Sequence, residues 1–275
     1  MSTRFRGYAG VCAVIVTGLL LLSCSQDEVA APRSAEVIFE SAKAKFDDED
    51  YREAYDELRI LTLQYPGDDL ADDAQFLMAE CKYRREEYLL AAFEYETLLR
   101  TSPTSEFVPN ARFMRAMCYY ESSRSSSLDQ ENTRKAIDEF QAFIEYHPTD
   151  ARVPEAEQRI QDMNAKLAKK EYENGIIYMK MEYYRAAGIY FDLILEKYHD
   201  TEYAEPALFK KAESFYYRKR YRESMEILNR FQERYPESSL REDVRVLRGE
   251  IEKDLSEADS GKAQTITDTN RKPVP

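Results

Sequence analysis

A short pattern of small and large residues recurs five times along the chain, and it limits the possible folds more than any other feature. Each copy has a small residue, a large apolar residue four positions later, and another three positions after that. This spacing places the three side chains on one face of a helix. The small residues are Ala54, Ala91, Ala136, Ala187 and Ser224, followed by Leu58 and Leu61, Tyr95 and Leu98, Phe140 and Phe143, Phe191 and Ile194, and Leu228 and Phe231.

A second helical pattern precedes each copy. Its small residues are Ala42, Ala79, Ala116, Gly175 and Ala212, each with an aromatic residue three positions earlier. The two small residues of a repeat lie 12 positions apart in four repeats and 20 apart in the third, so the segment "SSRSSSLDQENT" predicts a longer loop there. From Pro148 to Gly175 the distance is 27 positions, where other junctions have 13, which predicts about four extra helical turns.

Paired helices of this kind must stack on their neighbours, because one pair cannot bury its apolar face alone. The small residue, the aromatic residue and the closing proline of the second helix resemble the tetratricopeptide repeat. We therefore predict an all-α, right-handed superhelical solenoid of five tetratricopeptide-like helix pairs plus a C-terminal capping helix. The expected repeats span about 35–66, 72–103, 109–148, 154–199 and 205–236, with the cap at 239–255.

Polar residues suggest where helices begin and where the folded part ends. Ser105, Asp150, Thr201 and Ser239 occupy expected helix starts and are predicted to cap free backbone amides. Residues 256–275 are polar and almost without large apolar side chains, so we expect a disordered tail.

The N-terminus has the features of an exported protein. Arg4 and Arg6 precede an apolar run that ends in Leu21-Leu22-Ser23-Cys24, a sequence that resembles a bacterial lipobox. The resemblance implies a signal peptide at 1–23, a lipid on Cys24 and a tether at 24–34, so the chain is anchored to a membrane without spanning it. The alternative is an ordinary signal peptide or a membrane anchor in which Cys24 is incidental.

Charge and residue usage exclude several classes of function. Without residues 1–23 the chain has 37 basic and 52 acidic residues, which argues against a nucleic-acid partner. His147 and His199 both fall in turns, and no metal-ligand spacing or phosphate loop is present, so we expect no catalytic residue, cofactor or metal. Cys81 and Cys118 are predicted as small buried thiols, although a disulfide between them stays open.

Two groups of residues are candidates for binding. The segment "FKKAESFYYRKRYRE" is an exception on an acidic chain, and Arg218, Lys219, Arg220 and Tyr221 form a candidate docking patch for an acidic partner. The alternative is a helix end with cations near its negative dipole. Positions flanking the core pattern, Asp73, Leu77, Glu80 and Arg84, are candidates for a peptide groove, whereas most aromatic residues have core spacing.

The lipobox, five repeats, longer third loop and long helix together resemble the BamD-type lipoproteins of the outer-membrane β-barrel assembly machinery. The resemblance implies a lipid-anchored scaffold at the periplasmic face of the outer membrane. Its partners would be a BamA-like barrel insertase, held by the C-terminal repeats through a POTRA domain, other lipoproteins of the machinery, and unfolded outer-membrane protein segments. Residues Gln26-Asp27-Glu28 leave surface exposure open. The alternatives are a pilotin-like or envelope-coordination adaptor and, less favoured, a glycan-binding lipoprotein.

Overall fold

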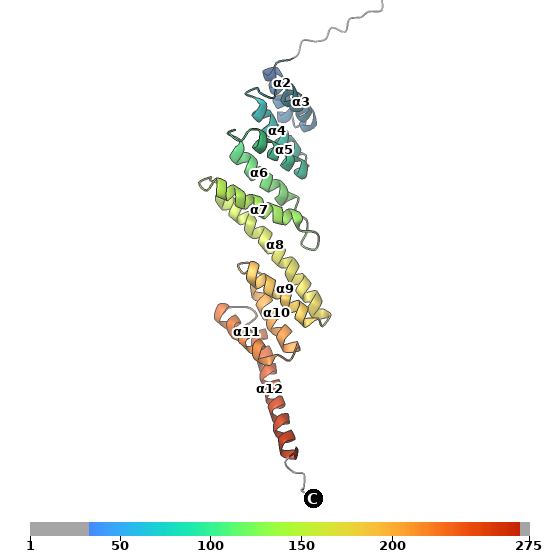
Figure 1. Cartoon of the computed structure of the whole chain (residues 1–275), viewed down its shortest axis with the longest axis vertical. Coiled ribbons are helices and arrows are strands. Elements are labelled where there is room, and N and C mark those ends of the chain that lie inside the picture. The colour runs from blue at the N-terminus through green and yellow to red at the C-terminus, as the bar shows by residue number, and fades with distance from the viewer. Residues whose placement is uncertain (1–32, 270–275) are drawn as a thin grey trace, which may run out of the picture.

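The computed structural model describes residues 33–269, with side chains described through Glu257. Helices are the only regular elements in that range (Figure 1). In chain order they are α2 (Ala35–Asp47), α3 (Tyr51–Gln64), α4 (Ala71–Arg84), α5 (Tyr88–Thr101), α6 (Val108–Glu121), α7 (Glu131–Tyr146), α8 (Val153–Lys180), α9 (Tyr184–Lys197), α10 (Ala204–Tyr217), α11 (Tyr221–Arg234) and α12 (Arg241–Thr269).

The helices form an elongated solenoid in which each helix packs on the one before and the one after it. The stack runs from α2 at one end to α12 at the other, and the end of α12 projects beyond the packed helices (Figure 1). The predicted all-α architecture of five helix pairs and a C-terminal helix is confirmed. None of the helices in the described part of the chain combines the length and the apolar character needed to cross a membrane.

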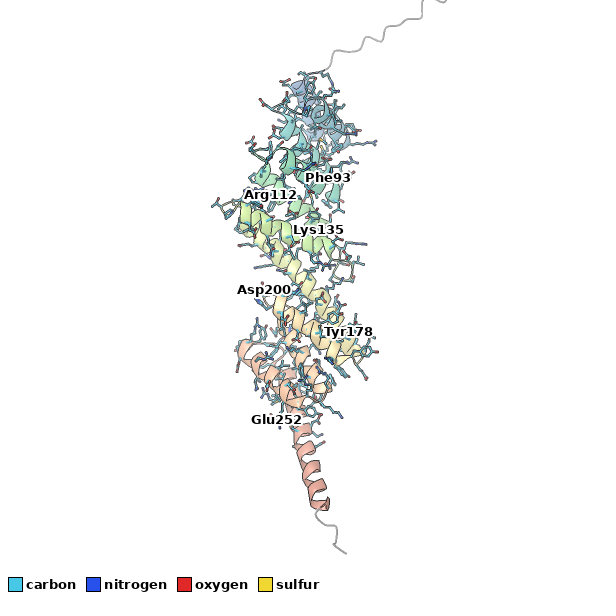
Figure 2. All side chains as sticks on the ribbon, in the orientation of Figure 1. Phe93, Arg112, Lys135, Tyr178, Asp200 and Glu252 are labelled. Carbon is cyan, nitrogen blue, oxygen red and sulfur yellow. The ribbon has the colours of Figure 1, made fainter. Side chains whose placement is uncertain are left out.

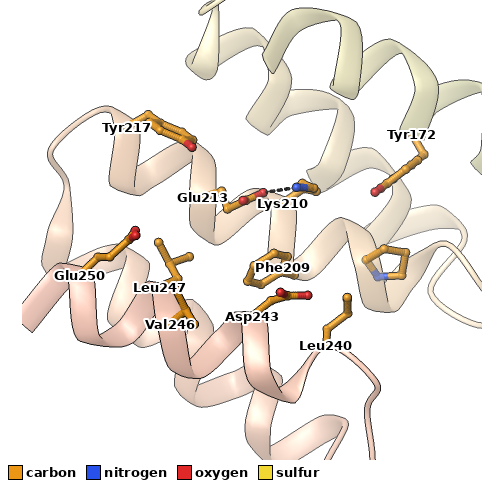
Figure 3. A pocket seen from close by; sticks show the side chains of 11 residues that line it. Tyr172, Phe209, Lys210, Glu213, Tyr217, Leu240, Asp243, Val246, Leu247 and Glu250 are labelled. Atoms are coloured by element: carbon orange, nitrogen blue, oxygen red, sulfur yellow. Dashed lines mark ion pairs between the residues drawn. The ribbon is translucent and has the colours of Figure 1, made fainter. Parts of the chain in front are cut away.

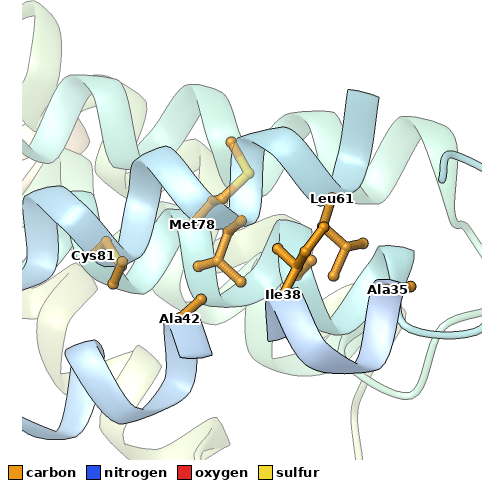
Figure 4. Packing of buried hydrophobic residues seen from close by; sticks show 9 residues of the cluster. Ala35, Ile38, Ala42, Leu61, Met78 and Cys81 are labelled. Atoms are coloured by element: carbon orange, nitrogen blue, oxygen red, sulfur yellow. The ribbon is translucent and has the colours of Figure 1, made fainter. Parts of the chain in front are cut away.

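The core follows the repeat pattern of the sequence. Small residues of both helices in each pair are fully buried, as are the large residues four and seven positions after the second one. In the first repeats, Ile38 and Ala42 of α2 pack with Leu61 of α3 and with Met78 and Cys81 of α4 (Figure 4). Burying a side chain the size of Leu61 contributes about 1.5–3 kcal/mol relative to its exposure. Neighbouring repeats therefore stabilise one another through a continuous apolar interior.

Tight turns join the two helices in four of the pairs. Glu49, Glu86, Glu182 and Lys219 hold the same turn position, and each has a left-handed backbone with φ between 59° and 65°. In each turn the next residue donates its backbone N–H to a carbonyl five residues earlier, as Asp50 does to Lys45 at 2.8 Å. This is the Schellman arrangement that ends a helix, built here without glycine.

The long helix α8 connects two halves of the solenoid. Its first turns supply Ala156 and Met163 to the core around Phe113 and Phe140, and Ala168 belongs to the next core, with Phe191 of α9. Its 28 residues confirm the extra turns expected before Gly175.

The extra residues of repeat three form a loop that packs on the middle of α8. Lys166 donates a hydrogen bond to Ser123 Oγ at 2.9 Å, and Lys170 donates one to the Leu128 carbonyl at 2.5 Å. Inside the loop, Gln130 is almost fully buried and donates to three loop carbonyls. The two irregularities of the sequence therefore contact each other, which the sequence did not indicate.

The predicted helix caps are wrong by a few residues. Helices α6, α8, α10 and α12 begin two or three residues after the expected caps. Ser105 and Asp150 instead accept hydrogen bonds from the backbone N–H two residues ahead, at 3.2 and 2.9 Å, and Ser238 rather than Ser239 does so before α12. Short polar side chains favour this local turn, which precedes the helix and takes the place of a cap. Thr201 bonds back to the Tyr198 carbonyl.

The expected end of the cap helix at residue 255 is also wrong, because α12 continues to Thr269. Residues 256–269 hold one glycine and no proline, so nothing in this stretch stops the helix that the buried Val244 and Ile251 anchor. Residues 1–32 and 270–275 lie outside the described part. The predicted signal peptide, Cys24 and most of the tether fall there.

Candidate partner-docking surface

Exposed apolar side chains gather around the start of α9 and the end of α10. Tyr183 and Ile189 are 59% and 65% exposed, and Tyr217 of the next repeat is 50% exposed. A shallow hollow of about 520 Å³ is lined by Glu182, Tyr183, Tyr184, Arg185, Ala186, Ile189 and Arg218. We call Tyr183, Tyr184, Ile189, Tyr217 and Arg218 the C-terminal surface. Exposed aromatic and aliphatic groups beside an arginine have the composition of a protein-binding site.

An aromatic stack holds this surface together across two repeats. The rings of Tyr184 and Tyr217 lie 4.9 Å apart at an interplanar angle of 18°. Tyr184 opens α9 and Tyr217 closes α10, so the contact fixes the α8–α9 turn against the α10–α11 turn. A partner that covers both turns would meet a surface whose parts are already in position, which reduces the entropy lost on binding.

The structure brings only one of the predicted docking residues, Arg218, into this surface. Its guanidinium lies 5.1 Å from the Phe215 ring centroid. Partial burial, together with the nearby Arg220 and Arg185, lowers its pKa from the ordinary arginine value. Arg185 and Arg218 line the hollow together with one carboxylate, Glu182, and the excess positive charge favours an anionic group on a partner.

The other predicted docking residues have structural partners or structural roles. Arg220 also lies over the Phe215 ring, at 4.8 Å from its centroid, and forms an ion pair with Glu223 at 2.7 Å. Lys219 is the exposed left-handed turn residue. Tyr221 lies 5.8 Å from the Tyr216 ring, and both pack against the core that holds α12.

Much of the remaining positive charge in this segment is neutralised. Lys210 pairs with Glu213 at 2.6 Å, and Lys211 pairs with Asp192 of α9. The predicted basic patch therefore has fewer unpaired charges than the sequence suggests. The sequence of this segment alone could not show that Asp192, on the preceding helix, pairs with Lys211.

A second hollow adjoins the C-terminal surface between α8, α10 and α12 (Figure 3). Its volume is about 390 Å³. Tyr217, a residue of the C-terminal surface, also lines this second hollow. The Lys210–Glu213 pair forms one wall, and Asp243 and Glu250 of α12 face it. This mixture of charges and apolar side chains suits a polar peptide segment better than a small apolar ligand.

Tyr183 and Ile189 were not predicted from the sequence, although a comparison of the repeats contains one indication for Ile189. Ile189 occupies the position two residues after the small residue of its second helix. The matching residues of repeats one, three and five are Asp56, Asp138 and Glu226. An isoleucine where other repeats carry an acid points to a use beyond the repeat fold.

The predicted groove residues lie along α4. Leu77 packs against the first core cluster, and Glu80 accepts a hydrogen bond from the buried Tyr95 hydroxyl. Arg84 is exposed and lies 3.9 Å from Glu80. Burial, reinforced by Asp72, raises the pKa of Asp73. Two of the four residues therefore support the fold, and binding by this face stays a prediction.

The described residues offer little basis for a metal site or a nucleophilic cysteine. Between residues 33 and 257, no three His, Cys, Asp or Glu side chains are grouped in a way that could hold a metal ion. Cys81 and Cys118 are both free and buried, as predicted, and burial raises the pKa of the Cys81 thiol to about 12. A thiol with so high a pKa is a poor nucleophile.

Comparison with known proteins gives family matches and more distant structural matches. None of the curated proteins matches the chain. A solved tetratricopeptide-repeat protein from Parabacteroides merdae ATCC 43184 is 17% identical, with 87% of this chain and 80% of that one covered and a TM-score of 0.35. A repeat protein from Thermus thermophilus is 14% identical, with 79% and 98% covered and a TM-score of 0.33. The TPR2AB domain of yeast Sti1 is 12% identical, with 82% and 86% covered and a TM-score of 0.40.

Two family models match the chain itself. A tetratricopeptide-repeat model matches residues 206–238, which contain α11 and most of α10. The model of the YfiO outer membrane lipoproteins matches residues 32–218, more than half of the chain. The protein therefore belongs to the YfiO family of outer membrane lipoproteins, the BamD-type repeat lipoproteins that its sequence resembles.

Proposed function

We propose that the protein is a non-catalytic, lipid-anchored scaffold of the outer-membrane β-barrel assembly machinery. In this proposal the C-terminal repeats dock onto a BamA-like barrel insertase, and the N-terminal repeats receive unfolded outer-membrane protein segments. Lipid on Cys24 would hold the scaffold at the periplasmic face of the outer membrane. Membership of the outer membrane lipoprotein family is the observation that carries the proposal.

The C-terminal surface supports the docking role. Tyrosine rings bury a large area at small entropic cost and keep a polar group for a hydrogen bond, which makes them common anchors of interfaces. Tyr183, Ile189 and Tyr217 are exposed without serving the core. Arg218 and Arg185 would meet an acidic group of the insertase at the rim of this contact.

Charge distribution supports a division of roles between the two ends. Residues 35–103, the first two repeats, hold 18 acidic and 8 basic residues, a net charge of −10. Residues 205–255, the fifth repeat and the packed part of α12, hold 11 acidic and 12 basic residues, a net charge of +1. A solenoid presents separate surfaces along its length, so ends of different charge suit different partners.

Crosslinking and purification of the native lipoprotein test the proposal. The test variant combines Tyr183→Ser and Ile189→Ser, and a second variant is Arg218→Glu. The control is Leu63→Ser in repeat one, since Leu63 is also exposed, at 70%, but lies far from the C-terminal surface. We expect the wild type and the control to recover a barrel insertase. The test variants should recover about tenfold less of it. Recovery of other partners, with no insertase, would refute the proposed function.

A further inference from the structure

Three apolar side chains on α5 are exposed without any role in the core. Leu89 and Leu90 are each 54% exposed, and Phe93 is 61% exposed. Their spacing puts them on one face of the helix. Phe93 projects from α5 in the upper part of the molecule (Figure 2). We call Leu89, Leu90 and Phe93 the α5 face.

The other repeats show that the fold does not need apolar groups at these positions. Where repeat two has Leu89, the other four second helices have Arg52, Arg134, Arg185 and Arg222. Where it has Leu90, they have Glu53, Lys135, Ala186 and Glu223, and where it has Phe93, they have Asp56, Asp138, Ile189 and Glu226. Repeat two therefore carries apolar residues at three positions where most repeats carry charges, and their exposure costs solubility unless a partner covers them.

The surroundings of the α5 face are acidic. Glu86 and Glu96 are exposed at either end of it, and neither forms an ion pair within residues 33–257. Arg100 lies one turn further along. The face also belongs to the two repeats whose net charge is −10. A field of this sign attracts a basic partner and accelerates its association.

Charge and backbone geometry narrow the choice of partner. A second copy of this chain would bring two strongly acidic halves together, and an anionic bilayer would meet the same repulsion. An extended segment could not pair with the backbone, because α5 offers no open sheet edge. A helix can lay an apolar stripe against a ridge of exposed side chains.

We propose that the α5 face docks a basic amphipathic helix of a partner protein, with the apolar stripe of that helix on Leu89, Leu90 and Phe93. Lysine or arginine residues beside the stripe pair with Glu86 and Glu96. This interaction is separate from the proposed C-terminal docking and does not depend on it.

A designed peptide tests the proposal directly. The probe is a labelled helix of about 18 residues, five turns, built from a leucine stripe and lysine flanks, and its counterpart has glutamate in place of lysine. Binding to the mature chain, kept soluble by Cys24→Ser, is followed by fluorescence anisotropy at about 0.15 M salt. The test variant, Leu89→Arg/Leu90→Glu/Phe93→Asp, carries the residues of repeat one, which fit the fold. The control, Leu63→Asp, also adds one negative charge at an exposed apolar residue, but Leu63 belongs to neither the α5 face nor the C-terminal surface.

We expect the lysine peptide to bind wild type and control equally and to bind the triple variant at least about tenfold more weakly. The triple variant is one charge more negative than wild type, so a loss of affinity must come from the apolar contacts. Equal binding of the glutamate peptide, or unchanged binding by the triple variant, would overturn the proposal. Two other results would also overturn it. One is a dimer of the wild type in sedimentation that the triple variant does not form. The other is flotation of the wild type, but not of the triple variant, with phosphatidylethanolamine–phosphatidylglycerol vesicles.

Discussion

Gly175 of α8 lies directly against the ring of Phe191 of α9. A Cβ atom at Gly175 would be 2.5 Å from Cε1 and 2.8 Å from Cζ of that ring. Phe191 is fully buried and cannot move aside without disturbing its core. The other four repeats have alanine at the position of Gly175. Repeat four therefore brings the two helices closer than an alanine allows.

We expect Gly175→Ala to destabilise the fold by about 1–3 kcal/mol, because the added methyl group overpacks the core. Gly249→Ala is the matched control, since Gly249 is also helical but has nothing within 4 Å of its would-be Cβ. That change should stabilise the protein by about 0.5–1 kcal/mol through helix propensity. Chemical denaturation measures both, and equal effects of the two changes would contradict the close approach.

A buried polar network joins the first two repeats. Glu94 of α5 accepts hydrogen bonds from the Tyr55 hydroxyl at 2.6 Å and from Gln75 Nε2 at 2.8 Å, and it is 8% exposed. Glu94→Ala leaves the half-buried Tyr55 hydroxyl without this acceptor and leaves Gln75 Nε2 only the backbone carbonyl of residue 94, at 3.1 Å, and should cost about 1–3 kcal/mol. Tyr55→Phe should cost about 1 kcal/mol. Tyr51→Phe should cost nothing, because no hydrogen bond of the Tyr51 hydroxyl is found among residues 33–257. Hydrogen exchange should accelerate in α2 and α3, and exchange that stays unchanged in Glu94→Ala would refute the network's role.

Gln130 organises the loop that packs on α8. Its amide donates to the carbonyls of Ser125, Leu128 and Asp129, and its oxygen accepts from Thr133 at 2.7 Å. Gln130→Ala should release the loop and make residues 124–128 cleavable by protease, with a loss of about 1–3 kcal/mol. Ser127→Ala is the control, since Ser127 is exposed and bonds only to Ser125 among the described residues. If protease digests Gln130→Ala and wild type at the same rate, Gln130 does not hold the loop.

The stability of the junction before α8 should depend on pH, because Asp150 there forms an ion pair with Arg152. Its carboxylate accepts hydrogen bonds from the side chain and backbone of Arg152, which lower its pKa from 3.8 to about 2. A lowered folded-state pKa means that the stabilisation is present above about pH 4 and is lost as pH falls towards 2. Asp150→Asn should therefore cost up to about 2 kcal/mol at pH 7, and the difference from wild type should vanish near pH 2. Melting curves across this range would contradict the prediction if the difference persisted in acid.

The lipid anchor is tested at Cys24, which lies outside the described residues. Cys24→Ser should abolish fatty-acid labelling and move the protein from the membrane fraction to the soluble periplasm, because the acyl chains would supply the attachment. Ser25→Ala, a change beside the cysteine that keeps the thiol, should stay lipidated. A wild-type protein without an acyl label would refute lipidation, and cleavage by protease added to intact cells would indicate exposure at the cell surface.

The repeat pattern determined most of the fold. The spacing of small and large residues identified both helices of each pair, the longer α8 and the loop of repeat three, because helical periodicity and segment length are local properties of a sequence. The pattern did not predict where the helices begin. Ser105 and Asp150 have residue types that suit either a cap or a preceding turn, so composition alone could not separate the two.

The candidate site depended on tertiary structure. The sequence offered Arg218, Lys219, Arg220 and Tyr221 as one basic patch, but the packing of repeats sent Tyr221 towards the cap helix and paired Lys211 with Asp192. Exposure and ion pairing are set by neighbouring helices that lie tens of residues away. For that reason the sequence alone specified which residues form the helices and the core. Stacking of the repeats decided that Tyr184 meets Tyr217 and that Arg218 joins Tyr183 and Ile189 at one surface.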